Sequence, residues 1–441
     1  IDKIIKKYKG DETMKNKRIL ASTCSAVLAL MMATTSFAAG WTKDNGTWKY
    51  LNSRNEYVTD SWQKSGDKSF YLGSDGNMVV NALIETGDNV YGVDENGAML
   101  VNTWAKFNSD DDDQAHWYYF TSTGRAKKEG FETINGKKYH FTDYKMDENW
   151  IKVNNDTYFL NDVHDGTYGS VVTGWKYVTN VDEDNSNTPS KEGWYYFDTN
   201  GKMVYGKEKK IGNYYYAFDD EGLMQDNWVG MQKASGSNLT YKFYNTSNGD
   251  RAEGWKYLPE MDEEDGLATQ EGWYFFRNGI PYTASNKTTV INNGYGVAKI
   301  NGKVYCFDNL GKMVTGKVDS SDPGKYYYFD DKNGDMKYGK VRFTNSDDLD
   351  DNDYYFAENG VIGKKGESFT GVHKNYLYDH GVLVRADDSR YMIATVNGKN
   401  YLVNKTGKVV GKGTYKDSDT ELKYTVTVDS NGNYTIKTEK Y

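Results

Sequence analysis

Tryptophan and tyrosine are the residues of this sequence whose types and spacing suit ligand chemistry. Tryptophans recur in pairs that flank short stretches of chain, three of them enlarged and acidic. The pairs are Trp104/Trp117, Trp175/Trp194, Trp255/Trp273 and, across a short stretch, Trp41/Trp48. Aromatic rings at regular intervals can pack between repeated units or serve as platforms for a ligand. We expect most of them to pack between units and a minority to meet a ligand.

Carboxylates gather in the enlarged stretches, at residues 108–115, 179–192, 258–271, 345–353 and 416–421. Solvated loops are one interpretation of them. A Ca²⁺ site is the other, because stacked carboxylates repel one another and a hard cation with oxygen ligands would relieve that repulsion. The calcium candidates are Asp182, Asp184, Asp347, Asp348, Asp350 and Asp351. Their spacing differs from that of an EF-hand loop, so no metal site is predicted.

Catalytic chemistry has less support in the sequence. Cys306 takes a tyrosine position within Val304-Tyr305-Cys306-Phe307, which predicts a small buried side chain. No motif supplies the base that a catalytic cysteine needs. His373 and His380 are interpreted as a surface pair. We therefore expect no enzyme activity, no catalytic residue and no cofactor.

The unit that must position the aromatic rings is visible at residues 193–206. Residues 194–197 are an aromatic run that suits a strand, and residues 198–201 carry an Asn-Gly turn signal. Residues 202–205 are expected to return antiparallel, which makes one β-hairpin. A lone hairpin is marginal in water, so copies must stack and bury one another's aromatic faces.

Variants of this unit recur along the chain from Trp41. Their first strands are expected near Trp48, Phe70, Val90, Trp117, Lys138, Thr157, Trp194, Tyr214, Thr240, Trp273, Val304, Tyr326, Asp353, Asn375, Asn400 and Lys423. Asn-Gly pairs at 135–136, 301–302 and 397–398 are interpreted as links from one hairpin to the next. The enlarged acidic connections enter every third hairpin. The sequence therefore predicts an all-β solenoid of about sixteen stacked hairpins, with about three hairpins per turn.

Composition agrees with a repeat protein. The 441 residues include 39 Tyr and 45 Gly but only 4 Pro, and aromatics reach 15%. Such a composition fits many thin aromatic interfaces better than one thick aliphatic core. The net charge of -9 argues against a nucleic-acid partner.

Four segments are expected along the chain. Residues 1–13 are interpreted as a non-native extension, and residues 14–38 as a secretory signal peptide with a basic start, an apolar middle and small residues at the cleavage site. Its apolar part is too short to span a bilayer, so no membrane insertion is expected. Residues 39–365 hold the hairpin repeats, and residues 366–441 hold degenerate repeats of the same solenoid.

Two stretches carry a family resemblance. Residues 40–50, Gly-Trp-Thr-Lys-Asp-Asn-Gly-Thr-Trp-Lys-Tyr, and the unit at 192–206 resemble the choline-binding, cell-wall-binding repeats of Gram-positive surface proteins, with a Clostridia-like pattern. Toxin receptor-binding repeats and streptococcal glucan-binding repeats are similar too. The resemblance implies a hairpin solenoid with about three hairpins per turn. It also implies a secreted protein that attaches non-covalently to teichoic acid or polysaccharide of the cell wall.

The resemblance also implies a type of site. In choline-binding repeats a quaternary ammonium lies among aromatic rings of successive hairpins, held by cation–π attraction. Carried over to this sequence, the best-matched cage is Trp48, Trp62 and Tyr71 with Met78 nearby. Further candidates are Trp104, Trp117, Trp175, Trp194, Trp255 and Trp273. Trp62 is expected to be a partly exposed platform. Trp194 is expected to be a packing residue, because Lys207 stands where its cage partner should be.

Three functions remain open at this point. The first is a secreted, non-catalytic protein that binds choline-bearing or other cell-wall polymers. The second is a carbohydrate receptor-binding protein, for host glycans or glucan. The third is a wall-hydrolase-associated protein that lacks its enzyme domain.

Overall fold

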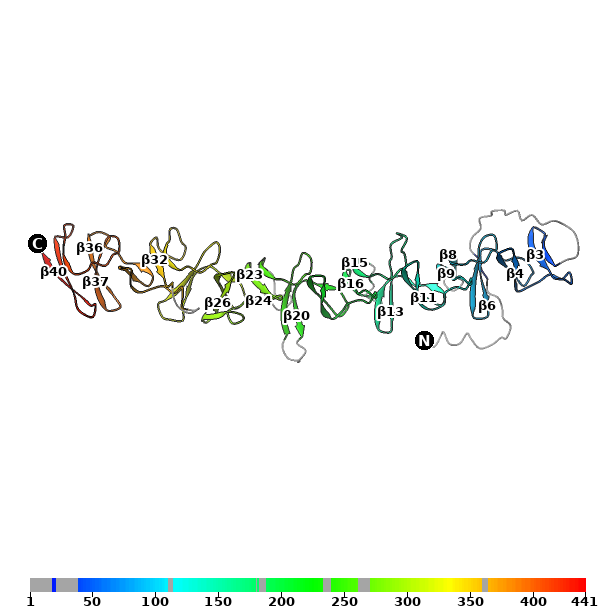
Figure 1. Ribbon diagram of the computed structural model, residues 1–441, viewed down its shortest axis with the longest axis horizontal. Helices are drawn as coiled ribbons and strands as arrows, with labels where there is room; N and C mark the ends of the chain where they lie inside the picture. The colour runs from blue at the N-terminus through cyan, green and yellow to red at the C-terminus, as the bar shows by residue number, and fades with distance from the viewer. Residues whose placement is uncertain are drawn as a thin grey trace. The chain divides into compact units, whose positions relative to one another are not determined.

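Every element of the described residues is a β-strand (Figure 1). The computed structural model describes residues 18–20, 39–109, 114–179, 181, 188–232, 239–260, 270–358 and 364–441. The predicted all-β class is confirmed. Over the same residues, no helix is long and apolar enough to cross a membrane. Apart from residues 18–20, the predicted extension and signal peptide lie outside the described residues.

The chain divides into two compact units. One holds Ile1–Lys207 and Phe218–Met224, and the other holds Glu208–Ala217 and Gln225–Tyr441. The strands of the first unit are β1 (Arg18–Leu20), β2 (Gly40–Asp44), β3 (Thr47–Leu51), β4 (Ser61–Ser65), β5 (Lys68–Leu72), β6 (Ala82–Thr86), β7 (Asn89–Val93), β8 (Thr103–Asn108), β9 (Ala115–Phe120), β10 (Gly130–Ile134), β11 (Lys137–Thr142), β12 (Lys145–Met146), β13 (Trp150–Val153), β14 (Asp156–Phe159), β15 (Gly174–Val178) and β16 (Gly193–Phe197).

Three strands have residues in both units: β17 (Lys207–Ile211), β18 (Tyr214–Phe218) and β19 (Met224–Gln225). The strands of the second unit are β20 (Asn227–Gln232), β21 (Leu239–Tyr244), β22 (Gly254–Leu258), β23 (Gly272–Arg277), β24 (Ile280–Pro281), β25 (Thr289–Asn292), β26 (Tyr295–Ile300), β27 (Lys303–Phe307), β28 (Met313–Val314), β29 (Gly316–Asp319), β30 (Tyr326–Phe329), β31 (Gly339–Arg342), β32 (Asp353–Phe356), β33 (Gly371–His373), β34 (Tyr376–Asp379), β35 (Val382–Leu383), β36 (Tyr391–Val396), β37 (Lys399–Asn404), β38 (Gly413–Asp417), β39 (Leu422–Val428) and β40 (Tyr434–Lys440).

The hairpin itself differs from the predicted one. The Gly-Trp strand β15 pairs antiparallel with the aromatic strand β16, from Gly174 opposite Phe197 to Val178 opposite Gly193. The segment after β16 makes a single bridge, Phe197 to Met203, and forms no return strand. The aromatic strand is therefore the second strand of its hairpin. The enlarged acidic stretch lies between the two strands of one hairpin, so its assignment to a connection between hairpins was wrong.

The three Asn-Gly pairs were misassigned for the same reason. Asn135-Gly136 closes the hairpin β10–β11, in which Ile134 pairs with Lys137. The pairs at 301–302 and 397–398 likewise close β26–β27 and β36–β37. Asn135 and Gly136 both have positive φ, 50° and 77°. That combination is typical of the two-residue turn whose twist matches the flanking strands, so these pairs lie inside hairpins.

The segment after each aromatic strand links neighbouring hairpins. Asp198 Oδ1 accepts hydrogen bonds from the backbone N–H groups of Asn200 and Lys202, which closes a tight turn. Met203 N–H then donates to the carbonyl of Thr157 in the preceding hairpin at 2.9 Å, and the next N–H donates back to its own hairpin. The same bond to the preceding hairpin recurs at Met78 with Trp48, Met99 with Ser69, Met336 with Val304 and Val409 with Asn375. Consecutive hairpins are therefore held together by main-chain hydrogen bonds as well as by rings.

Strand alternation decides which rings enter the core. In β16, Tyr195 and Phe197 are fully buried, whereas Trp194, which precedes them, points to the other face and is 44% exposed. In β23, Tyr274 is buried and Trp273 is 44% exposed. Successive side chains of a strand point to opposite faces, so the buried and exposed aromatics alternate.

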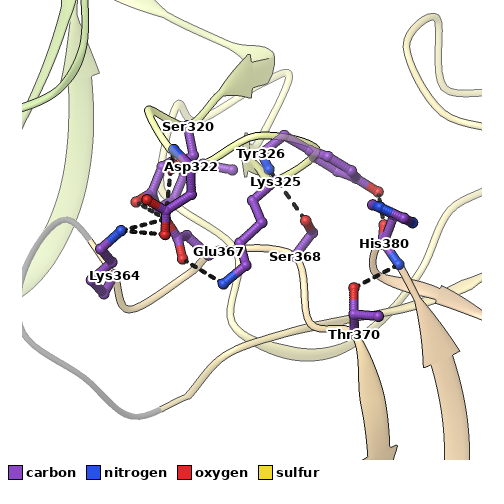
Figure 2. A network of polar contacts seen from close by, with 10 residues as sticks. Ser320, Asp322, Lys325, Tyr326, Lys364, Glu367, Ser368, Thr370 and His380 are labelled. Carbon is purple, nitrogen blue, oxygen red and sulfur yellow. Dashed lines mark hydrogen bonds and ion pairs between the residues drawn. The ribbon is translucent and has the colours of Figure 1, made fainter. Parts of the chain in front are cut away.

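A buried polar network connects turns of the second unit (Figure 2). The Glu367 side chain is almost fully buried, and its carboxylate accepts hydrogen bonds from Ser320 Oγ at 2.6 Å and Tyr327 OH at 3.1 Å. Lys325 and Lys364 lie at 3.4 Å and 3.5 Å from its two oxygens. A buried charge is tolerated only when it is paired and hydrogen-bonded, and Glu367 is both.

Candidate ligand-binding site

The first-strand tryptophans pack across neighbouring hairpins. The Trp104 ring lies 5.1 Å from Tyr119 on its own hairpin. On the next hairpin it lies 4.9 Å from Tyr139 and stacks on Phe141 at 5.8 Å. One indole therefore joins two hairpins through their aromatic strands.

The second unit repeats this arrangement with different residues. The Trp255 ring lies 5.1 Å from Phe275 on its own hairpin, 4.8 Å from Tyr305 on the next, and stacks on Phe307 at 5.9 Å. The Trp175 ring likewise lies 5.1 Å from Tyr196 on its own hairpin. The Gly-Trp position is therefore a packing position, half-buried between hairpins.

The second-strand tryptophans lie at the rim of the same interfaces. Trp194 and Trp273 are both 44% exposed. Each meets the tyrosine opposite it in edge-on contact, Tyr177 at 5.4 Å and Tyr257 at 5.5 Å. Trp194, which was expected to be a packing residue, does contact Tyr177, but it is not buried, because strand alternation directs Tyr195 and Phe197 into the core.

One of these interfaces contains a cavity of about 300 Å³. Its lining residues are Trp104, Trp117, Tyr139, Met146, His164, Gly166 and Tyr168. Tyr139 and Met146 are buried, and the two tryptophans are half-buried. His164 is exposed and stacks on Tyr168 with ring centroids 4.0 Å apart. The lining thus consists mostly of aromatic rings, with one thioether.

The surrounding charges are of both signs. Burial, followed by a hydrogen bond with Glu148, raises the pKa of Tyr168 to about 12, so its hydroxyl stays neutral beside a carboxylate. Lys106 Nζ lies 6.0 Å from the Trp117 ring. Aromatic faces together with a nearby carboxylate suit a bulky, weakly hydrated cation such as a quaternary ammonium.

The cage predicted from the resemblance is arranged differently. Trp62 contacts Tyr71 at 5.2 Å and Tyr91 at 5.3 Å, but Tyr71 is buried in the core, 3% exposed. Trp48 lies beneath Lys43 Nζ, 5.9 Å from the ring centre, and its carbonyl accepts the Met78 N–H. The structure therefore brings Trp62 and Tyr71 together as packing partners, while Trp48 occupies the rim position of Trp117.

Sequence reasoning named Trp104 and Trp117 but missed the other lining residues. Tyr139 and Met146 could have been found, because they stand in the hairpin that follows the tryptophan pair. His164 and Tyr168 come from the loop after β14, and no motif marks them.

Two of the calcium candidates that the structure describes accept main-chain hydrogen bonds with their carboxylates. Asp348 Oδ2 accepts the Lys317 N–H at 2.9 Å, and Asp351 Oδ1 accepts the Asn345 N–H at 2.8 Å. Asp182 and Asp184 lie outside the described residues. Within the residues that are described, no group of three or more His, Cys, Asp or Glu side chains could hold a metal ion.

Two further predictions concern single residues. Cys306 is fully buried, and burial raises the pKa of its thiol, so the predicted small buried side chain is confirmed. His373 is not part of a surface pair, because its ring stacks on Tyr355 at 4.1 Å, whereas His380 is exposed.

The chain carries repeats of the choline-binding, cell-wall-binding type, which confirms the predicted resemblance. Residues 295–340 match the choline-binding repeat family, and residues 60–78 and 190–203 match a family of cell wall binding repeats.

Curated relatives are similar over more than half of this chain. Glucosyltransferase-S of Streptococcus mutans is 28% identical over 317 residues, which cover 63% of this chain and 20% of that protein. Glucosyltransferase-I of Streptococcus downei is 25% identical over 278 residues, 58% of this chain and 16% of that protein. The chain thus spans about a fifth or less of the length of these relatives.

Solved structures from Streptococcus pneumoniae are also similar. The modular autolysin LytC shares 22% identity over 63% of this chain and 52% of that chain, with a TM-score of 0.38. Choline binding protein F shares 19% identity over 86% of this chain and the whole of that chain, with a TM-score of 0.28.

Proposed function

We propose that this chain binds cell-wall polymers that carry choline or another quaternary ammonium group, through aromatic sites between its hairpins. The observation that supports the proposal is the cavity between Trp104, Trp117, Tyr139 and Met146. A cation over an aromatic face gains about 0.5–2 kcal/mol, so several rings around one ammonium give a weak site. Weak sites joined in one chain hold a polymer by avidity.

The wider setting of the proposal follows from the repeats. The protein acts as a secreted, non-catalytic surface protein that associates with teichoic acid or polysaccharide of a Gram-positive wall. Its signal peptide is residues 14–38. About sixteen hairpins stack as a solenoid with about three hairpins per turn, and residues 39–365 and 366–441 are its regular and degenerate parts. The main-chain bonds between consecutive hairpins support such stacking.

The test is a choline titration followed by NMR at the His164 ring. Choline that enters the cavity lies beside His164 and should shift its ring resonances. Replacing Trp117 by Ala removes one wall from a half-buried position, so affinity should fall about three- to tenfold with little change in stability. Tyr214→Ala is the control, since Tyr214 is 57% exposed and lies outside the cavity.

The proposal is overturned if millimolar choline leaves the His164 resonances unchanged, or if W117A and Y214A bind choline equally well. Binding of purified glycans without choline, measured in parallel, would then favour the carbohydrate receptor alternative. Wall hydrolysis by the purified chain would contradict the non-catalytic part of the proposal.

A further inference from the structure

A second cavity in the first unit has a different lining. Its volume is about 230 Å³, and it lies among the turns of three consecutive hairpins. The lining residues are Lys152, Asn155, Thr157, Thr188, Pro189, Met203, Tyr205, Asp220 and Glu221. None of them was singled out in the sequence as a ligand residue.

The second cavity and the aromatic cavity each contain a methionine from the same position of the hairpin repeat. Met203 follows the turn after β16 and bridges Phe197, as Met146 follows the turn after β11 and bridges Phe141. Met203 lines the second cavity, and Met146 lines the aromatic cavity. The walls differ, because the tryptophans around Met146 are replaced around Met203 by lysine, amide, hydroxyl and carboxylate groups.

The lining of the second cavity combines apolar and polar groups. Pro189 is buried, Met203 is half-buried, and the Tyr205 ring is 46% exposed, and these three residues supply its apolar part. Lys152 and Asn155 provide hydrogen-bond donors, and Asp220 and Glu221 provide acceptors.

One acceptor is held firmly in position. Glu221 Oε2 accepts hydrogen bonds from the Ser190 N–H at 2.8 Å and the Ser190 hydroxyl at 2.5 Å. These bonds lower the pKa of Glu221, so the carboxylate stays ionised. A fixed carboxylate can direct a second hydrogen bond toward a ligand without loss of side-chain freedom on binding.

We propose that this cavity binds a polyhydroxylated ring, a sugar unit of the polymer that the repeats engage. A sugar has an apolar face that can lie against Tyr205 and Met203, and hydroxyl groups that both donate and accept. It can therefore satisfy the ammonium of Lys152 and the carboxylates of Asp220 and Glu221 together. A quaternary ammonium has neither an N–H donor nor an acceptor, so it could form none of these hydrogen bonds.

The experiment uses the full chain with ¹³C-methyl-labelled methionine, because the methyl groups of Met203 and Met146 report on the two cavities separately. The probes are methyl α-D-glucopyranoside, N-acetylglucosamine and choline chloride. At least one of the two sugars should shift the Met203 methyl and leave Met146 unmoved. Tyr205→Ala should weaken that response about three- to tenfold, the loss of one ring contact, and Asp220→Asn should weaken it as well.

The controls keep this proposal separate from the proposed function. Tyr205 and Asp220 are exposed, so both variants should retain the wild-type Met146 spectrum, which shows that the unit is folded. The sugar proposal is overturned if neither sugar shifts Met203, if choline shifts it instead, or if Y205A and D220N respond like the wild type. Each of these results leaves the choline titration at His164 intact as an independent test.

Discussion

At the scale of single residues, tryptophan has two different roles that depend on its strand. In the first strand it is surrounded by rings of its own and the following hairpin, as Trp104 and Trp255 are. In the second strand it lies at the rim, as Trp194 and Trp273 do. Burial differs between the two positions, so replacing the tryptophan at each position should have different effects on stability and on ligand binding.

Trp150 and Trp194 provide a matched pair in the first unit. Trp150 is 7% exposed and contacts Phe159, Tyr195 and Phe197 in the core. Replacing it by Ala should lower the free energy of unfolding by about 3–5 kcal/mol, through lost burial and a residual cavity. Replacing the exposed Trp194 by Ala should cost below about 1 kcal/mol.

Urea unfolding of both variants, compared with the wild type, measures these differences. Equal losses in W150A and W194A would contradict the assignment of separate packing and rim positions. This prediction differs from the expectation from sequence, in which Trp194 was a packing residue.

At the scale of the hairpin, the turn after the aromatic strand is the most constrained part of the unit. Gly201 has a φ of +84°, and a Cβ there would lie 2.2 Å from Val171 Cγ1 of the loop that precedes β15. Left-handed backbone and close approach both favour glycine at this position.

Alanine at Gly201 should therefore be destabilising for two reasons. Backbone strain costs about 1–2 kcal/mol, and overpacking against Val171 adds about 1–3 kcal/mol. Gly46 is the matched control, because its φ is +87° but nothing lies within 4 Å of its added Cβ. Thermal unfolding should show a larger loss for G201A than for G46A, and equal losses would mean that the contact with Val171 is unimportant.

The turn after β30 predicts a specific acid sensitivity. Asp330 accepts hydrogen bonds from Lys337 and from the N–H groups of Lys332 and Asn333, and these lower its pKa from 3.8 to about 2. A carboxyl with a depressed folded-state pKa contributes stability that is present above its unfolded value. That contribution, at most about 2.5 kcal/mol, is lost as pH falls from about 4 to about 2.

Unfolding free energies measured between pH 5 and pH 2 should therefore fall less steeply in Asp330→Asn than in the wild type. Asp331→Asn is the control, since Asp331 bonds the Tyr328 hydroxyl and not Lys337. An unchanged pH slope in D330N would show that the turn does not contribute to acid unfolding.

At the scale of the whole molecule, the chain has many small cores in place of one large core. Trp150, Phe159 and Phe197 belong to one cluster in the first unit. Val297, Tyr327 and Phe329 belong to another in the second unit. Contacts of this kind lie between neighbouring hairpins, so stability should be a sum of local terms.

If the free energy of unfolding is a sum of local contributions, a destabilising substitution in one unit should leave the other unit folded. In W150A, amide hydrogen exchange should accelerate in β13 to β16, while protection in β26 to β30 stays near that of the wild type. Exchange measured by mass spectrometry on peptides of both units tests this. A uniform loss of protection along the chain would show that the units unfold as one cooperative body.

The sequence by itself determined the class of structure and the type of repeat. Alternating aromatic strands such as Trp194 to Phe197, Asn-Gly pairs and regular recurrence are local signals, and they predicted β-hairpin repeats and the choline-binding resemblance. These signals depend on strand propensity and turn geometry within a few residues, so they can be recognised without knowledge of the rest of the chain. The buried place of Cys306 was predictable for the same reason.

Only the tertiary structure decided which strands pair and which rings face a ligand. The chain after Phe197 was expected to return along β16 as a strand, but it makes a single bridge there, and Met203 N–H bonds to Thr157 in the preceding hairpin. That choice is non-local, because it requires the hairpin that contains Thr157, more than forty residues earlier, to be in place. Once β15 became the partner of β16, strand alternation buried Tyr195 and left Trp194 at the rim. When a strand pairs with a different partner, its rings point to different faces, so different residues line each site. The local sequence pattern stays the same in both cases.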